Sequence, residues 1–169
     1  GPTPSQWWGE RMVSEDNGAT WKDQRRLPGH VMGPIKNKAV QLEDGRILCP
    51  SSSEHAGWRV HVEITNDLEN WEVVGPLNDP ATMGAIQPAI LTYPNGRLQM
   101  LCRTKGKGFI SESWSQDGGR TWSPMSLTNL PNPNSGIDAV TLKDGRQLLV
   151  FNNTKKGRSP LNVATSQDG

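Results

Sequence analysis

The sequence predicts an all-β fold, a β-propeller of four-stranded antiparallel blades, from three observations. A Ser/Thr-x-Asp motif recurs at Asp16, Asp67, Asp117 and Asp168, so its copies are 51, 50 and 51 residues apart. An Asp/Asn-Gly-Arg turn between two apolar runs precedes each of the last three copies. Glycine and proline are frequent (18 and 13 residues), and helical periodicity is scarce. Because a fixed period of about 20–50 residues marks a repeat architecture, four short strands per interval indicate one propeller blade.

Each repeat begins with two strands joined by the Asp/Asn-Gly turn. The first strands are expected at 39–42, 89–92 and 139–142, and the second strands at 47–49, 98–102 and 147–151. Third strands are expected at 6–13, 59–64, 109–114 and 161–165, each leading into a Ser/Thr-x-Asp motif. The fourth strand begins at the tryptophan that follows the motif. The chain then carries two strands of one blade, two whole blades and three strands of another.

The Ser/Thr-x-Asp motif has a structural explanation, which is clearest in Ser115–Trp122. Its aspartate can accept hydrogen bonds from N–H groups of its own tight turn, and its glycine supplies a backbone angle closed to other residues. Its tryptophan can cover apolar surface of the neighbouring blade. We therefore expect the four repeated aspartates to be structural and not catalytic.

Composition and charge exclude several functions. The net charge of +1 and the pI near 8.0 provide no basic field for nucleic acid. No apolar run approaches the roughly 18 residues of a membrane span. His, Cys and carboxylates are not spaced as metal ligands, so we expect no metal and no other cofactor. Cys49 and Cys102 lie at different depths of adjacent repeats, which favours two buried thiols over a disulfide.

The expected topology separates the two ends of the strands. The Asp/Asn-Gly hairpins and the Ser/Thr-x-Asp turns lie at one end, so the starts of the first strands and the ends of the second strands meet at the other. Polar residues occupy the latter positions: Lys38, Gln87 and Asp138 at first-strand starts, and Ser52, Arg103 and Asn152 at second-strand ends. The adjoining loops add Glu54 and Arg158, while Arg59, His61 and Glu63 form a polar row on one side of a third strand.

The repeated turns resemble the Asp-boxes of the sialidase (neuraminidase) superfamily, also called BNR repeats. The resemblance extends from position 33 to position 169, through the segments 33–38, 86–88, 130–138 and 161–164. It implies a six-bladed propeller, of which about half is present, with the active site at the end opposite the Asp-boxes. We divide the single partial domain, 1–169, into the blade segments 1–30, 35–76, 86–128 and 137–169.

The resemblance also implies roles for the polar residues. Sialidases hold the carboxylate of sialic acid with three arginines, because a guanidinium matches a carboxylate with two parallel hydrogen bonds. Asp138 and Glu54 are the candidate general acids or bases, with Asp138 preferred because a buried axial carboxyl could have a raised pKa. The candidate substrate-binding residues are Arg103, Arg59, Arg158, Lys38, Asn37, Gln87, His61 and Asn152.

Simpler interpretations remain for several of these residues. Asp138 could bond the neighbouring backbone of the 134–136 loop, and Arg59 could pair with Glu63. Arg158 could be an ordinary loop residue. The tyrosine nucleophile of the family has no counterpart, because the single tyrosine, Tyr93, adjoins the hairpin at the opposite end. We expect the nucleophile outside these residues, and no activity from this segment alone.

Three functions follow. The first is a sialidase-like glycoside hydrolase of the exo-α-sialidase type, which cleaves a terminal acidic sugar from glycans. The second is a propeller hydrolase or lyase that acts on uronate-containing polysaccharide through His61 and an arginine. The third is a non-catalytic carbohydrate-binding propeller. In each case the partner is a glycan or acidic sugar, and further blades or a second chain are needed to cover the open sheets.

Overall fold

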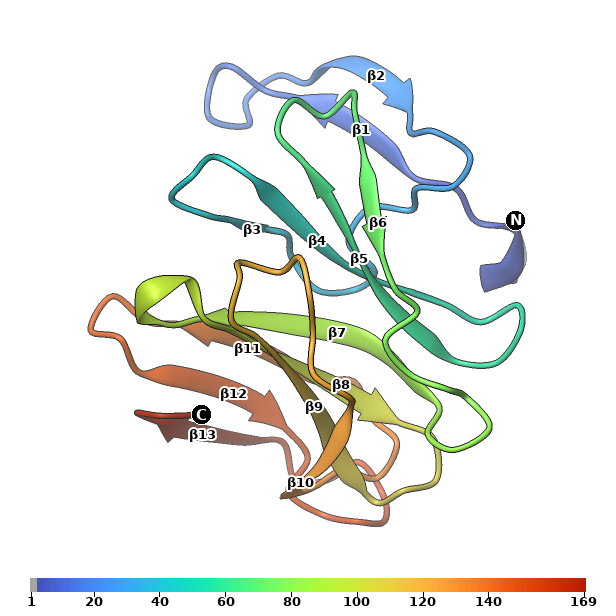
Figure 1. Ribbon diagram of the computed structural model, residues 1–169, viewed down its shortest axis with the longest axis vertical. Helices are drawn as coiled ribbons and strands as arrows, with labels where there is room; N and C mark the ends of the chain where they lie inside the picture. Colours follow the sequence, from blue (N-terminus) through green and yellow to red (C-terminus); the bar gives the residue numbers. More distant parts are fainter. Residues whose placement is uncertain (1–2) are drawn as a thin grey trace.

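The computed structural model describes residues 3–169; residues 1 and 2, the start of the expected segment 1–30, lie outside the described residues. Its strands form four antiparallel sheets, and within each sheet the strand order follows the chain (Figure 1). The first sheet is β1 (Glu10–Val13) and β2 (Lys22–Arg26). The second sheet is β3 (Val40–Gln41), β4 (Ile47–Ser53), β5 (Arg59–Thr65) and β6 (Glu72–Val74). The third sheet is β7 (Ala85–Thr92), β8 (Leu98–Thr104), β9 (Phe109–Ser115) and β10 (Ser126–Pro131). The fourth sheet is β11 (Asp138–Thr141), β12 (Gln147–Phe151) and β13 (Asn162–Ser166).

The expected strands are present, with differences at their ends. β4 and β8 run on to Ser53 and Thr104, and β7 begins at Ala85, four residues before its expected start. The strand expected at 6–13 begins only at Glu10, because Pro4–Gln6 forms a 3₁₀ turn, η1, for which Pro4 supplies the fixed backbone angle. A second 3₁₀ turn, η2 (Pro94–Gly96), forms the hairpin between β7 and β8. The fourth strand of the third sheet does not start at Trp122; β10 begins after Pro124, which lacks a backbone donor.

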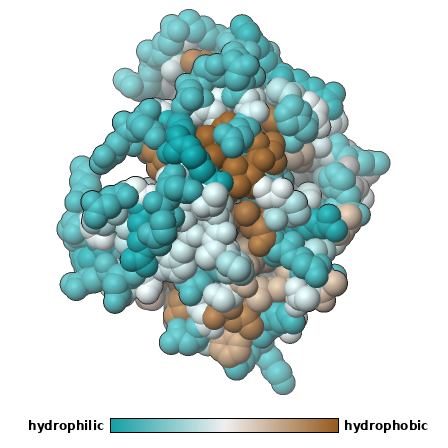
Figure 2. All heavy atoms as spheres, in the orientation of Figure 1, coloured by the Kyte–Doolittle hydropathy of each residue, from teal (hydrophilic) through white to brown (hydrophobic). Residues whose placement is uncertain are grey.

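Two apolar cores hold the sheets together on either side of the third sheet. Because neighbouring side chains of a strand point to opposite faces, Leu98, Met100 and Cys102 of β8 pack toward the second sheet, whereas Leu101 packs toward the fourth. Val60 and Val62 of β5 face the first of these cores and are fully buried. The face shown in Figure 2 is mostly hydrophilic, with hydrophobic side chains gathered near its middle and its lower edge.

The Ser-x-Asp turns are held by their aspartates. Asp117 accepts hydrogen bonds from the backbone N–H groups of Arg120 and Thr121 and from the Thr121 hydroxyl, at 3.0, 2.9 and 2.6 Å. Partial desolvation raises the pKa of Asp117, but the hydrogen bonds, led by that of Thr121, outweigh it and bring the pKa to about 2. Asp16 has the same bonds to Thr20. These carboxylates are therefore occupied within their own turns.

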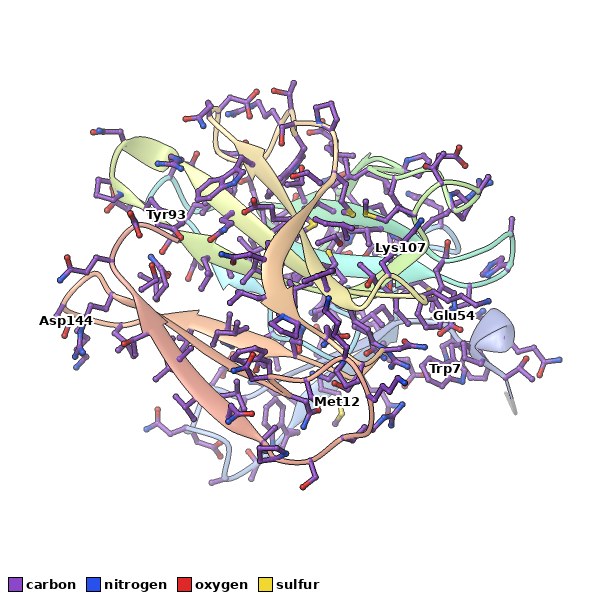
Figure 3. The ribbon with its side chains drawn as sticks, turned by 90° about the horizontal axis from the view of Figure 1, so that it is seen from below. Trp7, Met12, Glu54, Tyr93, Lys107 and Asp144 are labelled. Carbon is purple, nitrogen blue, oxygen red and sulfur yellow. The ribbon has the colours of Figure 1, made fainter. Side chains whose placement is uncertain are left out.

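The two ends of the sheets differ in their loops (Figure 3). Tyr93 and Asp144, which adjoin the hairpins, lie at one end of the molecule, and Glu54 and Lys107 lie at the other. Cys49 and Cys102 are both buried and free. No helix among residues 3–169 is long and apolar enough to cross a membrane.

Candidate active site

A polar cluster joins the starts of the leading strands of three sheets. Lys38, just before β3, places its Nζ 3.0 Å from Asp138 Oδ1 and 2.9 Å from the carbonyl of Ala139, both on β11. Lys36 Nζ donates to the carbonyl of Ile137 at 2.6 Å. Between them, Asn37 Nδ2 donates at 2.9 Å to the carbonyls of residues 87 and 88 on β7. The segment 36–38 of the second sheet therefore reaches both the third and the fourth sheets.

Arg103, at the end of β8, lies beside this segment. Its Nε donates to Asn134 Oδ1 at 2.7 Å and its Nη1 to Gln87 Oε1 at 3.3 Å, while the guanidinium lies 5.2 Å from the centre of the Trp58 ring. Partial burial lowers the pKa of Arg103, and the nearby charge of Arg158 lowers it further. Because Gln87, Asn134 and Trp58 are neutral, they hold the guanidinium in place without neutralising it.

The backbone at this cluster adopts uncommon angles. Lys36, Gln87 and Asn134 have φ angles of 68°, 56° and 62°, in the left-handed region. Gln87 also lies at a register shift between Ile86 and Ala89, which re-aims its side chain toward Arg103. Such a conformation costs about 1–2 kcal/mol for a residue with a side chain, and such residues gather at binding sites where the surroundings impose them.

The loop between β4 and β5 contributes an aromatic residue. Trp58 Nε1 donates to Glu54 Oε2 at 3.1 Å, and Lys105 Nζ lies 5.6 Å from the centre of the Trp58 ring. The candidate acid Glu54 is thus joined to Arg103 through Trp58. Our sequence analysis missed Trp58, Asn134 and Lys36; their positions in loops at the same end as Arg103 were the available signal.

The loop after β12 brings Arg158 to the cluster, and Asn152 holds this loop in place. Arg158 Nη2 donates to the carbonyl of Asn134 at 3.3 Å, so Arg158 reaches the cluster. Asn152 Nδ2 donates to the carbonyls of Arg158 and Pro160 at 2.9 and 2.8 Å. Asn152 therefore uses both amide hydrogens to hold this loop, which leaves only its oxygen for a substrate.

Asp138 is less enclosed than expected. Its side chain is 47% exposed and is paired with Lys38, so the burial on which we based its role as an acid is absent. It also accepts a hydrogen bond from the N–H of Ala139 at 2.8 Å, which lies on its own strand and not in the 134–136 loop that we considered as the alternative partner. Asp138 is the first residue of β11, and there it pairs with Lys38, whose side chain is 50% exposed.

Cations outnumber carboxylates in the cluster. Lys36 lies near the charges of Asp138, Lys38 and Arg103, and partial burial is the main cause that lowers the pKa of Lys36. Arg158 and Lys105 add positive charge, and Glu54 adds the second carboxylate. An excess of positive charge beside partly desolvated donors can bind an anion, in particular a carboxylate.

Arg59 and His61 lie apart from this cluster. Alternation along β5 directs them, with Glu63, away from the core side of Val60 and toward the segment that links the first sheet to the second. The pairing of Arg59 with Glu63 that we considered is wrong: Glu63 contacts His61 Nε2 at 3.0 Å instead. The remaining bonds of Glu63 come from the backbone of the segment that links the first sheet to the second.

Tyr93 is a structural residue at the opposite end, as its place in the hairpin predicts. Its hydroxyl donates to Gln99 Oε1 at 2.7 Å, and its ring packs 5.2 Å from that of Trp114. Burial raises the pKa of Tyr93 to about 12, which disfavours the phenolate that a nucleophile needs. No group of three or more His, Cys, Asp or Glu side chains that could hold a metal ion occurs in the described part of the chain.

Comparison with known proteins relates the chain to sialidases. A sialidase from Paraclostridium sordellii is 24% identical over 181 residues, which cover 90% of this chain and 44% of that protein. A solved structure of unknown function from Dyadobacter fermentans matches with a TM-score of 0.72 at 20% identity, over 91% of this chain and 46% of that one. The intramolecular trans-sialidase from Ruminococcus gnavus matches with a TM-score of 0.68 at 27% identity, over 92% of this chain and 35% of that one.

The chain thus spans less than half the length of these relatives. The profile of the BNR repeat-like domain family matches residues 1–169. From the repeated turns, the sheet order and this match over the whole sequence, it follows that the chain belongs to the BNR repeat-like domain family.

Proposed function

We propose that this chain is part of a glycoside hydrolase of the exo-α-sialidase type, which cleaves a terminal acidic sugar from a glycan. The observation that carries the proposal is the environment of Arg103. Its guanidinium is partly desolvated, is held by two neutral side chains, and lies in a cluster with an excess of cations. The similarity to a sialidase and to a trans-sialidase supports a sialic acid as the sugar.

Each residue has a role in this proposal. Arg103 binds the sugar carboxylate, and Lys38 and Arg158 at the edges of the cluster add to its attraction. Asp138 is the general acid, and release of its carboxyl from Lys38 accompanies substrate binding, because the substrate carboxylate offers Lys38 a second partner. Glu54 is the second candidate for a general acid or base. The nucleophile comes from outside these residues, since Tyr93 lies at the other end.

We further propose that the four sheets are blades of a six-bladed β-propeller and that their Ser-x-Asp turns are Asp-boxes. In this arrangement 1–169 is a partial propeller domain, and further blades or a second chain cover its open faces. Large apolar side chains exposed on, or one residue before, strands of the first and the fourth sheets support a covering partner. They include Trp21 at 57% exposure, Leu161 at 70% and Val163 at 66%.

Binding of the free sugar tests the role of Arg103. We would titrate the chain with N-acetylneuraminate and follow backbone amides of residues 87 and 134 by NMR. Arg103→Gln removes the charge and should weaken binding about ten-fold or more, as expected for a charge-assisted hydrogen bond. Arg120→Gln, an exposed arginine that bonds its own turn, is the matched control and should bind as the unchanged chain does. Equal affinity of the two variants would refute the role of Arg103.

Hydrolysis tests the reaction. A form that carries all six proposed blades should hydrolyse a fluorogenic sialoside, and Asp138→Asn should lower kcat by about 10²–10⁴-fold, the usual contribution of a general acid. An unchanged kcat would show that Asp138 is not the acid. Cleavage of a uronate-containing polysaccharide in place of the sialoside would favour the second function considered above. Sugar binding without any hydrolysis would favour a non-catalytic propeller.

A further inference from the structure

We propose that a second anion-binding site lies on the second sheet, beside the segment that links it to the first sheet, and takes the carboxylate or sulfate group of an acidic sugar. The site is a cavity of about 250 Å³. Its lining consists of His30, Ser53, Arg59, His61, Val73 and the Gly75–Pro76 segment. It is formed by the face of β5 that points away from the core, so it is separate from the cluster around Arg103.

Arg59 supplies the main attraction for an anion. Its Nε–H is buried and has no hydrogen-bond partner among residues 3–169. A buried donor without a partner is costly, most of all on a charged group, and its presence in a folded protein calls for an explanation. Arg59 also lines the cavity, where an oxyanion would pair with its guanidinium charge and offset part of this cost.

The nearby carboxylate of Glu63 does not neutralise this charge. Glu63 is fully buried, and its Oε2 accepts the N–H of Gly33 at 2.7 Å. Its Oε1 accepts the N–H of Met32 at 2.9 Å and lies 3.0 Å from His61 Nε2. Glu63 is therefore engaged on the side of the linking segment, and the described lining of the cavity contains no carboxylate.

The size and the walls of the cavity favour a small sugar anion. Its volume is below the roughly 300–1,000 Å³ of pockets that bury drug-sized ligands, so it fits one sugar unit. Val73 and Pro76 offer apolar surface for the C–H groups of a sugar ring, and Ser53 and His30 offer hydrogen bonds. A bound acidic sugar would place its anionic group at Arg59 and its ring against Val73, and so would contact both the polar and the apolar lining residues.

The test is an NMR titration of the 169-residue chain with glucuronate, glucose 6-sulfate and glucose. Backbone amides of Ser53, Val73 and Gly75 report this cavity, and those of Gln87 and Asn134 report the cluster around Arg103. We expect saturable shifts at the first set with the two anions and none with glucose. The preferred anion distinguishes a carboxylate site from a sulfate site.

Three variants and the control Arg120→Gln decide the assignment. Arg59→Gln should weaken binding at the cavity about ten-fold or more, whereas Arg103→Gln should leave it unchanged. His30→Gln, in an exposed loop where folding is not at risk, should weaken it by a smaller factor, about two- to three-fold. A thermal unfolding curve checks that Arg59→Gln folds.

Absence of shifts at Ser53, Val73 and Gly75, or shifts that persist in Arg59→Gln, would overturn the proposal. Equal weakening by Arg59→Gln and Arg120→Gln would also overturn it, since it would indicate general attraction by surface charge. Shifts confined to Gln87 and Asn134 would refute this site while supporting the function proposed for Arg103. Shifts confined to the cavity would support this site, and the role of Arg103 would rest on its own titration with N-acetylneuraminate.

Discussion

Replacement of Gly119 by alanine tests how the Ser-x-Asp turn packs between the second and third sheets. Gly119 is buried, has a φ of +90°, and a Cβ there would lie 2.6 Å from Leu48 Cδ2 and 3.4 Å from Leu98 Cδ1. Two costs follow. The left-handed backbone costs alanine about 1–2 kcal/mol, and overpacking of a closed core costs about 1–3 kcal/mol. We therefore expect Gly119→Ala to lower the free energy of unfolding by about 2–5 kcal/mol.

Gly145 provides a matched control. It has a φ of +86°, but a Cβ at this position would meet no atom of the described residues within 4 Å beyond its chain neighbours. Gly145→Ala should therefore show the backbone cost alone, about 1–2 kcal/mol. Any gain from a stiffer unfolded chain is the same in both variants and cancels in their difference. The assay is guanidinium denaturation followed by tryptophan fluorescence, with the free energy taken from the midpoint and slope. If the two variants lose equal stability, the turn does not pack tightly against Leu48.

Three further outcomes are expected. Asp117 has a pKa of about 2 against an ordinary 3.8, so its contribution to stability is present above about pH 4 and is lost as the pH falls toward 2. In acid denaturation, the free energy of unfolding of Asp117→Asn should therefore fall less steeply between about pH 4 and pH 2 than that of the unchanged chain. Equal steepness in the two proteins would contradict this. Asn37→Ala removes the side-chain donor to two backbone carbonyls of β7 and should lower the free energy of unfolding by about 2–4 kcal/mol, measured by denaturant titration. A change within about 0.5 kcal/mol, which is typical of a surface site, would contradict this structural role of Asn37. Burial is the main cause that raises the pKa of Cys49 to about 12, and burial also raises the pKa of Cys102. Neither thiol should therefore react with a thiol reagent at neutral pH until denaturant is added. Rapid reaction of the native chain would show that one of the two thiols is accessible.

Local signals in the sequence were sufficient for the strands and for the end of the molecule where polar residues gather. Turn chemistry and apolar alternation are short-range properties, and both depend on a few neighbouring residues. They place Lys38, Gln87 and Asp138 at equivalent positions of three repeats. In the structure Lys38 contacts Asp138, and the neighbour of Lys38, Asn37, contacts the Gln87 backbone.

Side-chain direction was less accessible to this reasoning. The alternation along β5 correctly placed Arg59, His61 and Glu63 on the same face of the strand, but it could not predict which neighbouring segment that face contacts. Gln87 shows the same limit, because a register shift and a left-handed backbone angle turn it toward Arg103. Neither feature has a reliable signature in a Gln-Pro pair.

The sequence by itself determined the repeat, the four-stranded unit and the structural role of the repeated aspartates, because these follow from short turn motifs and their regular spacing. Only the tertiary structure decided how the repeats share their polar side chains. Lys36 and Lys38 bond residues about 100 positions away, at Ile137 and at the start of β11, and Arg59 faces a cavity beside the segment that links the first two sheets. Contacts of that kind depend on the angle and the spacing between packed sheets. The packing of all side chains in both cores sets that angle and spacing, and no local sequence pattern encodes them.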